Sequence, residues 1–218
     1  MTDVVLIGAG DHGRGTLEII KACNAVSPRF NVLGYLDDAP GKRGQAVDGL
    51  PVLGGLAWIE ANHRDGLRYV IALADCTGKQ RIATRLEPLG LRYASVVHPS
   101  VVFSTGVNVG DGATIGAGVV IAHDTLVGEH VTVNLNASIG HDCVLGRFST
   151  VSPGANVAGR VQLGEGCEVG LNAAVGRGTH IGDWTSIGPG SVVVKNVASR
   201  QRVFGNPARL VPAGAALS

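Results

Sequence analysis

The chain has 218 residues, of which 45% are hydrophobic and 33 are glycine, and its formal net charge is +1. This apolar content excludes a disordered chain, because it can offset the entropy lost on folding, and the balanced charge excludes a nucleic-acid-binding surface. No apolar run reaches the length of a membrane span, no signal peptide opens the sequence, and the four cysteines form no CxxC pair. We therefore expect a cytoplasmic protein with reduced thiols.

Residues 1–97 alternate strand-like and helix-like segments. Strands are predicted at residues 3–7, 30–36, 68–74 and 93–97, and helices at residues 14–23, 54–62 and 77–89. This alternation predicts a parallel sheet that binds its ligand at the carboxyl ends of the strands. We place a domain boundary near residue 98, so that residues 1–97 form a Rossmann-like half domain of the α/β class.

A glycine-rich loop follows the first predicted strand. Gly8, Gly10 and Gly13 have the spacing GxGxxG before a helix, which suits a phosphate, and Asp37 follows the second strand. A dinucleotide enzyme is one interpretation, but residues 1–97 supply about one of the two mononucleotide halves that it needs. The loop therefore predicts a single bound nucleotide, and a loop that only packs the helix on the strand remains the alternative.

The second part of the chain repeats with a period of six. An aliphatic residue stands at every sixth position from Val109 to Val193, and a small residue follows nearly all of them. Helices repeat at 3.6 residues and strands at 2, so neither explains this period. A chain that forms a short strand and then turns a corner explains a period of six. Three such sides close a coil of 18 residues, so we predict five triangular coils, with the small residues at the bends.

Two histidines stand out by their place in this repeat. His123 and His141 are 18 residues apart, so they lie one coil above the other, and each precedes an aspartate. Histidine can accept a proton near neutral pH, and a neighbouring carboxylate orients it and raises its basicity. The residues alone do not distinguish the two pairs, and a solvated surface histidine is the alternative for each. The three zinc ligands of a solenoid carbonic anhydrase are missing, so we expect no metal.

The order of the motifs resembles that of the NeuD/PglD-type sugar acyltransferases of the hexapeptide-repeat superfamily. It runs from a strand, GAGDHGR and a helix to a strand ending in LDD, then to IGHDCVLGRFSTVSPGANVAG and GNPAR, and covers nearly the whole chain. The resemblance implies a left-handed parallel β-helix with a C-terminal tail over residues 98–218, and a homotrimer with active sites between subunits. The similarity is greatest to the nucleotide-sugar N-acetyltransferases, such as those acting on GDP-perosamine.

This resemblance implies a reaction. Acetyl-CoA would donate its acetyl group to the 4-amino group of a nucleotide-linked 4-amino-4,6-dideoxy sugar, carrying either GDP or UDP. We expect direct attack by the amine, because no serine or cysteine forms a recognisable nucleophile motif beside the histidines. Two alternatives remain, which are O-acetylation of sialic acid or another sugar, and a nucleotide-binding trimer without catalysis.

The resemblance also assigns residues. It implies His141 as general base with Asp142 as its partner, and the backbone N–H of Gly159 as the donor that holds the acetyl oxygen. It places the nucleotide sugar at Gly10, Asp11, His12, Asp37 and Asp38, and acetyl-CoA near Thr150, Leu171, Pro189 and Pro207. Thr150 is a departure, because the family often has a histidine there, and threonine cannot act as a second base.

Overall fold

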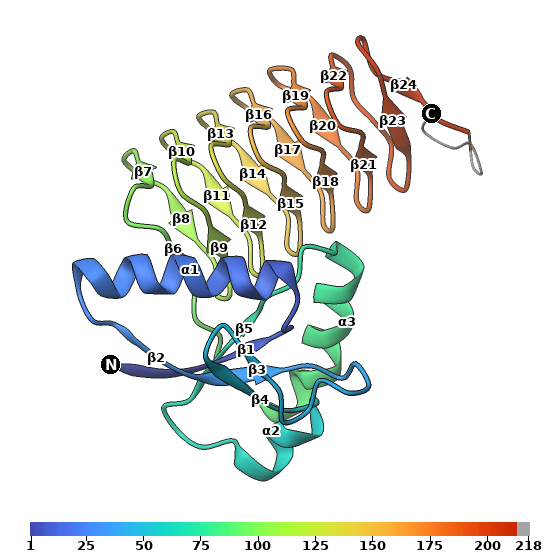
Figure 1. Ribbon diagram of the computed structural model, residues 1–218. Coiled ribbons are helices and arrows are strands. Elements are labelled where there is room, and N and C mark those ends of the chain that lie inside the picture. The colour runs from blue at the N-terminus through green and yellow to red at the C-terminus, as the bar shows by residue number, and fades with distance from the viewer. Residues whose placement is uncertain (213–218) are drawn as a thin grey trace.

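The computed structural model describes residues 1–212 and consists of an α/β part followed by a long coil of short strands (Figure 1). The last six residues of the predicted tail, 213–218, lie outside the described residues. In the described part, no helix is both long enough and apolar enough to cross a bilayer. All four cysteines are free and buried.

A mainly parallel sheet forms the centre of the α/β part. β1 (Thr2–Ile7) lies between β2 (Phe30–Leu36) and β5 (Arg68–Ile71), and both neighbours run parallel to it. β4 (Leu50–Gly54) extends the sheet beside β2, and β3 (Ala46–Val47) pairs with β4 as an antiparallel hairpin. The predicted strands 3–7 and 30–36 are confirmed, whereas the hairpin was not predicted. Its signal was Asp48-Gly49, since both residues have positive φ, 49° and 82°, as a type I′ turn requires.

Helices cover both faces of this sheet. α1 (Asp11–Val26) packs on the face that carries Val4 and Leu6, and α2 (Ala57–Asn62) and α3 (Cys76–Leu86) lie against the face of Val5 and Ile7. Successive β1 residues therefore enter opposite cores, as the alternation of side chains along a strand requires. A 3-10 turn, η1 (Glu87–Leu89), ends α3 before the chain enters the coil.

The coil is built from strands of two residues that recur every six residues. Their bounds are β6 (Val96–Val97), β7 (Val102–Phe103), β8 (Asn108–Val109), β9 (Thr114–Ile115), β10 (Val120–Ile121), β11 (Leu126–Val127), β12 (Thr132–Val133), β13 (Ser138–Ile139), β14 (Val144–Leu145), β15 (Thr150–Val151), β16 (Asn156–Val157), β17 (Gln162–Leu163), β18 (Glu168–Val169), β19 (Ala174–Val175), β20 (His180–Ile181), β21 (Ser186–Ile187) and β22 (Val192–Val193). A three-residue strand, β23 (Arg202–Phe204), and the antiparallel β24 (Arg209–Leu210) close the far end.

Parallel pairing stacks these strands into three sides. From β6 to β19, each strand pairs with the one 18 residues further on, as Ile121 does with Ile139 and Ile139 with Val157. We name the sides after one member: the β12 side contains β6, β9, β12, β15, β18 and β21, the β13 side runs from β7 to β22, and the β14 side from β8 to β20. The repeated aliphatic residue ends each strand and is buried from Ile115 to Val193. The predicted triangular parallel β-helix is confirmed.

The small residue after each aliphatic has a different cause from the predicted one. It does not sit in the bend, and Gly110 has no positive φ. A Cβ on Gly110 would come within 2.7 Å of the backbone nitrogen of Glu129 in the next coil, so close stacking of the coils excludes a larger side chain there. The left-handed turn residue comes two positions later, for example Asn136 with φ of 54° and Asn172 with φ of 52°.

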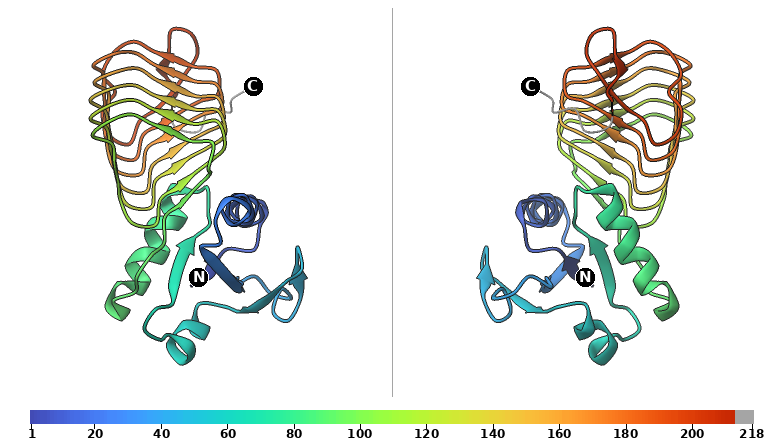
Figure 2. Two further views of the ribbon diagram at one scale, coloured as in Figure 1. Left: turned by 90° about the vertical axis from the view of Figure 1, so that its left-hand side faces the viewer. Right: turned by 90° about the vertical axis from the view of Figure 1, so that its right-hand side faces the viewer.

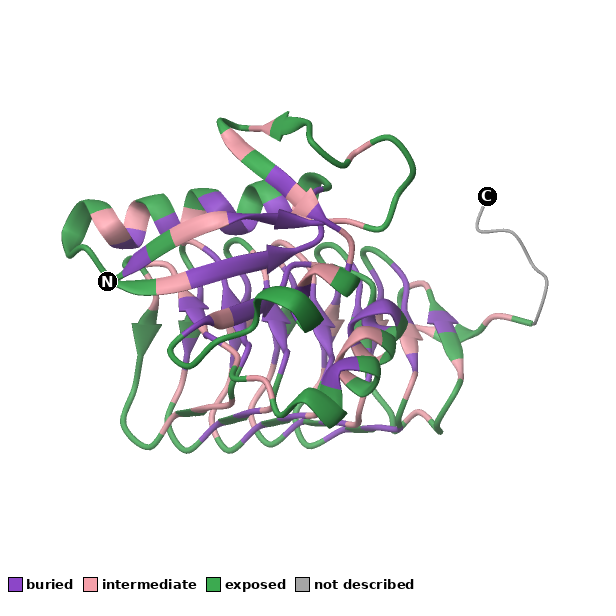
Figure 3. Ribbon diagram, turned by 90° about the horizontal axis from the view of Figure 1, so that it is seen from below, coloured by how far each residue is buried: buried purple, intermediate pink, exposed green. Residues whose placement is uncertain are grey.

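The α/β part packs against the β12 side (Figures 1 and 2). Lys79 of α3 is only 1% exposed, and its Nζ donates to Thr132 Oγ1 at 3.3 Å, the Ser149 carbonyl at 3.1 Å and Thr150 Oγ1 at 2.9 Å. Burial lowers the pKa of Lys79 to about 8, although nearby Cys76 and Asp75 oppose this. Figure 3 shows that the strands of the sheet and those of the coil both contain buried residues. Lys79 thus connects α3 to the coil through hydrogen bonds.

Candidate active site

The turns between the sides bring chemically similar residues into line. The turn that joins the β13 side to the β14 side contains, in successive coils, His123, His141, Gly159 and Arg177, and we call it the histidine corner. The turn that joins the β12 side to the β13 side contains Leu135, Pro153, Leu171 and Pro189, and we call it the apolar corner. The 18-residue register therefore concentrates ionisable groups on one edge of the prism and apolar groups on another.

His141 and Asp142 form the shortest side-chain pair at the histidine corner. His141 Nδ1 lies 2.6 Å from Asp142 Oδ2, and Asp142 takes the left-handed turn position with φ of 56°. The hydrogen bond from His141 holds the pKa of Asp142 below its usual value, with Arg160 3.8 Å away as a weaker contributor. A carboxylate at Nδ1 assigns the proton to that nitrogen and leaves Nε2 as an acceptor. The side chain is 34% exposed, so a substrate can reach it.

Gly159 lies directly beside this imidazole in the next coil. A Cβ at position 159 would come within 2.5 Å of His141 Nε2 and 2.8 Å of its Cδ2, so the ring occupies the space that a side chain would take. The Gly159 carbonyl accepts from the Gly178 N–H at 3.0 Å, but its own N–H has no acceptor among residues 1–212. A free backbone donor next to the basic nitrogen is the arrangement that an oxyanion requires.

The surroundings of the two His–Asp pairs differ in the structure, although the sequence alone did not distinguish them. His123 Nδ1 lies 3.0 Å from Asp124 Oδ2, and its side chain is 55% exposed. Its ring stacks on that of His141, with centroids 5.2 Å apart and planes 12° apart. The neighbour of His123 in the next coil is therefore another imidazole, whereas the neighbour of His141 is a glycine with a free N–H. His123, Asp124 and Asp142 also offer ligand atoms within 4.8 Å of one another, so a cation could bind there.

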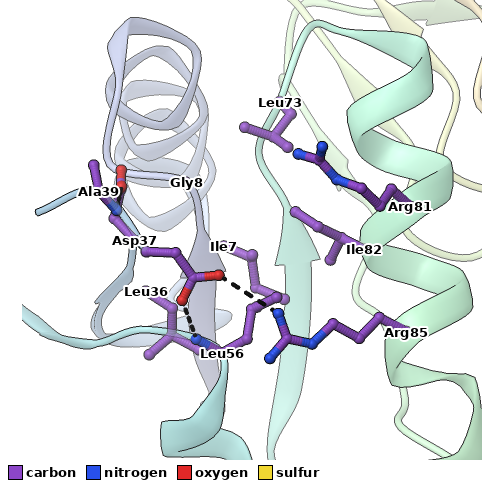
Figure 4. Close-up of a pocket in the computed structure, with 11 residues that line it drawn as sticks. Ile7, Gly8, Leu36, Asp37, Ala39, Leu56, Leu73, Arg81, Ile82 and Arg85 are labelled. Carbon is purple, nitrogen blue, oxygen red and sulfur yellow. Dashed lines mark hydrogen bonds and ion pairs between the residues drawn. The ribbon is translucent and has the colours of Figure 1, made fainter.

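A pocket of about 310 Å³ opens at the carboxyl ends of the parallel strands, between the glycine loop and α3 (Figure 4). The two predicted aspartates have different roles in it. Asp37 accepts hydrogen bonds from Ala9 N at 3.0 Å, Ala39 N at 2.9 Å and Lys42 Nζ at 2.8 Å. Burial raises the pKa of Asp37, but these donors outweigh burial and hold it below its usual value. Asp37 therefore organises the loop and has little capacity left for a ligand.

Asp38 keeps free capacity toward the pocket. Its Oδ1 accepts from Leu56 N at 2.9 Å, and its Oδ2 lies 3.8 Å from Arg85 Nη1. Arg81 and Arg85 both line the pocket from α3, and the sequence analysis missed them. Their signal was the spacing of four residues on a helix that follows a strand, which puts both side chains on one helix face.

The glycine loop mixes packing and binding positions. A Cβ on Gly13 would overlap the Gly8 carbonyl, so this glycine serves helix–strand packing, as the alternative interpretation had it. Gly10 is the N-cap of α1 and has open space around it, and Asp11 is exposed. Burial lowers the pKa of His12 to about 4, and its buried Nε2 has no hydrogen-bond partner among the described residues.

The residues expected at acetyl-CoA do not all share one surface. Leu171 is 48% exposed at the apolar corner, Pro189 is exposed one coil further on, and Pro207 is exposed near β23. Thr150 is only 5% exposed, and its hydroxyl donates to the Ala74 carbonyl at 2.9 Å while accepting from Lys79. Its surroundings give Thr150 a structural role between α3 and the coil, because its hydrogen-bonding capacity is already used there.

One chain does not bring the two halves of the site together. The pocket belongs to the part that packs on the β12 side, and the histidine corner is the edge opposite that side of the triangle. No hydrogen bond or ion pair within residues 1–212 joins the α/β part to the residues of the histidine corner. Within one chain, the pocket and His141 therefore lie on different faces of the prism.

A three-sided coil of hexapeptide repeats with a His–Asp pair at one corner is typical of the hexapeptide-repeat acyltransferases. Two family models match the chain. The PglD N-terminal domain matches residues 3–86, and the hexapeptide repeat of succinyl-transferase matches residues 99–122 and 160–195. None of the curated protein sequences matches significantly.

Solved structures resemble the chain over nearly its whole length. PerB from Caulobacter crescentus, in complex with CoA and GDP-perosamine, is 31% identical, covers 97% of this chain and 98% of its own, and has a TM-score of 0.89. The acetyltransferase domain of PglB from Neisseria gonorrhoeae FA1090, in complex with acetyl coenzyme A, is 26% identical, with coverages of 96% and 99% and a TM-score of 0.87. WeeI from Acinetobacter baumannii AYE is 25% identical, with coverages of 97% and 100% and a TM-score of 0.86.

The chain belongs to the NeuD/PglD-type family of hexapeptide-repeat sugar acyltransferases, which includes the perosamine N-acetyltransferase of Caulobacter crescentus. The fold class and the family predicted from the motifs are both confirmed.

Proposed function

We propose that this protein transfers the acetyl group of acetyl-CoA to the 4-amino group of a nucleotide-linked 4-amino-4,6-dideoxy sugar. The observation that carries the proposal is the His141–Asp142 pair, 2.6 Å apart, beside the free N–H of Gly159. Support also comes from PerB, which is 31% identical over nearly the whole chain and was solved with CoA and GDP-perosamine. GDP-perosamine is therefore the first substrate to test.

The chemistry follows from the histidine corner. The sugar amine, once it has lost its excess proton, attacks the thioester carbonyl of acetyl-CoA directly. His141 Nε2 accepts the proton that the nitrogen loses as the N–C bond forms, and Asp142 stabilises the resulting imidazolium. The Gly159 N–H donates to the oxyanion of the tetrahedral intermediate. Collapse of the intermediate expels the CoA thiolate, which takes the proton from His141.

Binding of the two substrates divides between the two parts of the chain. Gly10, Asp11 and His12 are proposed to meet the phosphates and the sugar, because they form the start of α1 beside the pocket. Leu171, Pro189 and Pro207 are proposed to lie along acetyl-CoA. This division corresponds to a nucleotide-sugar-binding domain at residues 1–97 and an acetyltransferase domain at residues 98–218.

A homotrimer would complete the site. Large apolar side chains are exposed on the two sides that meet at the histidine corner: Val102 at 55%, Phe103 at 41%, Val120 at 45%, Leu126 at 48% and Val144 at 38%. Exposed apolar groups gathered around one edge are typical of a protein interface. If a second copy covers them, its pocket can approach His141 from outside.

The test is release of CoA thiol from acetyl-CoA with GDP- and UDP-linked 4-amino-4,6-dideoxy sugars. We expect turnover with one of the amino sugars. His141→Asn should lower kcat by about 100-fold or more, because it removes the general base. His123→Asn is the matched control, since it changes the same residue type one coil away. Turnover only with a sugar hydroxyl, or loss through His123→Asn alone, would contradict the proposal.

A further inference from the structure

Two carboxylates and one imidazole converge beside His141 at the histidine corner. His123, Asp124 and Asp142 each offer one ligand atom, and these three atoms all lie within 4.8 Å of one another. Among residues 1–212, no other group of three or more histidine, cysteine, aspartate or glutamate side chains is gathered in this way. One turn of the coil supplies His123 and Asp124, and the next coil supplies Asp142.

The backbone holds the two carboxylates in register. Asp124 and Asp142 occupy the same left-handed turn position in successive coils, with φ of 55° and 56°, and the Asp142 N–H donates to the His123 carbonyl at 3.0 Å. The side chains of His123, Asp124 and Asp142 are 55%, 65% and 45% exposed. Small rotations of these exposed side chains can therefore bring their ligand atoms to the separation of about 3.5 Å that the ligands of one tetrahedral zinc ion have.

The charges at this place favour a divalent cation. Two carboxylates at close range repel each other. Among the described residues, Arg160 is the only lysine or arginine within 4 Å of either carboxylate, and its Nε lies 3.8 Å from Asp142 Oδ2. An ion between Asp124 and Asp142 would balance both negative charges.

The donor set indicates which ion would bind. Mg²⁺ and Ca²⁺ prefer six or more oxygen ligands, whereas an imidazole nitrogen combined with carboxylate oxygens suits zinc. We propose that His123, Asp124 and Asp142 form a binding site for Zn²⁺, with a fourth position left to water. The three histidines of a carbonic anhydrase are not needed for this site, because carboxylates also serve as zinc ligands.

An ion at this site would act on the neighbouring histidine. Asp142 Oδ2 lies 2.6 Å from His141 Nδ1, and the His123 and His141 rings stack with centroids 5.2 Å apart. Zinc on Asp142 competes with His141 for the carboxylate, and its charge disfavours the imidazolium that the reaction forms at His141. Zinc is therefore expected to inhibit acetyl transfer. This consequence rests on the proposed function, whereas zinc binding itself does not.

Calorimetric titration of the full-length protein with zinc chloride tests the site without any acetyl transfer. We expect one Zn²⁺ per chain, bound about 100-fold more tightly than Mg²⁺. His123→Asn and Asp124→Asn should each weaken zinc binding by about 10-fold or more, because each removes a ligand. His180→Asn is the matched control, since His180 is an exposed histidine of β20 and has no place in the cluster. His141→Asn should not weaken zinc binding, because His141 is not a ligand.

Two further measurements separate binding from inhibition. The visible spectrum of Co²⁺, titrated in place of Zn²⁺, should change with the wild type but not with His123→Asn. Zinc should lower CoA release by the wild type, and EDTA should restore it. His123→Asn keeps His141, Asp142 and Gly159, so it should need about 10-fold more zinc for the same inhibition.

Equal zinc affinity of the wild type and His123→Asn, absence of zinc binding, or loss of zinc binding in His141→Asn would overturn the inference. Zinc binding that leaves CoA release by the wild type unchanged would overturn the inhibitory role. Zinc binding by a protein that transfers no acetyl group would contradict the proposed function and leave the metal site standing.

Discussion

The imidazole of His141 occupies the space that the Cβ of any residue other than glycine would take at position 159. Gly159 thus meets two requirements: it leaves room for the ring, and its backbone N–H has no acceptor among residues 1–212. Free N–H groups occur at other turns of the coil as well, for example at Arg177, so a free donor alone does not mark a site. The Gly159 N–H differs from these donors because it lies beside a histidine whose other nitrogen is hydrogen-bonded to a carboxylate.

Gly159→Ala tests this arrangement. The added methyl group should push the His141 ring from its position, and kcat should fall by about 100-fold, because a misplacement of about 1 Å at reacting groups has effects of that size. Gly15→Ala is the control, since a Cβ at Gly15 meets no atom within 4 Å. Thermal melting of both variants shows whether folding is affected. An unchanged kcat in the Gly159→Ala variant would show that the contact between His141 and Gly159 is not needed for catalysis.

At the scale of elements, α3 connects the pocket with the coil. Asp75 caps the helix by accepting from the Gly78 N–H at 2.6 Å. One face of α3 presents Arg81 and Arg85 to the pocket, and Lys79 enters the contact with the β12 side. Lys79 has no carboxylate partner among residues 1–212, and its three acceptors are neutral oxygens. The charged form of this lysine is therefore poorly compensated when the α/β part docks.

This burial gives the docked state a dependence on pH. The pKa of Lys79 is lowered by burial from 10.5 to about 8, so between these values the unfolded chain binds more protons than the folded one, and stability rises with pH. The gain is on the order of 3 kcal/mol at most. The Lys79→Met variant should not show this gain in stability with rising pH. Denaturation at pH 7.5 and 9.5 should show the wild type gaining stability relative to Lys79→Met, but not relative to Lys21→Met, an exposed lysine of α1. Parallel pH profiles of wild type and Lys79→Met would refute the assignment.

At the scale of the whole molecule, the prism separates the two chemical parts. The pocket and the histidine corner lie on opposite sides of the triangle, and exposed apolar residues flank the corner. Homo-oligomers with cyclic symmetry repeat one interface between all neighbours, so in the proposed homotrimer each pocket would lie against the next chain's histidine corner.

Mixed oligomers test this sharing. His141→Asn and Asp38→Asn should each be nearly inactive with the guanosine-linked sugar, but their co-expressed mixture should regain activity. With random assortment, about a quarter of the sites combine an intact pocket with an intact His141. The measurement is CoA release by the purified mixture, with each variant expressed alone as control. A mixture no more active than its components would place both groups in one chain. Sedimentation of the wild type gives the number of chains of 22.3 kDa in the oligomer.

The sequence predicted most reliably where one physical cause acts at every repeat. Burial of an aliphatic residue at each sixth position predicted the coil, and the 18-residue register placed His123 above His141. The prediction was incomplete where contacts join distant segments. Thr150 was assigned to acetyl-CoA from a local motif, yet it hydrogen-bonds Ala74, a residue 76 positions away. Arg85 was missed because its partner Asp38 lies on another element.

The sequence by itself determined the prism, the α/β part and the family, because these follow from periodicity and from motifs whose residues are neighbours in the chain. The tertiary structure alone decided which aspartate is free to bind, which histidine lies beside an unused N–H, and that the pocket and His141 lie on opposite sides. These three outcomes depend on hydrogen-bond saturation and on packing between residues far apart in sequence, which no local pattern records.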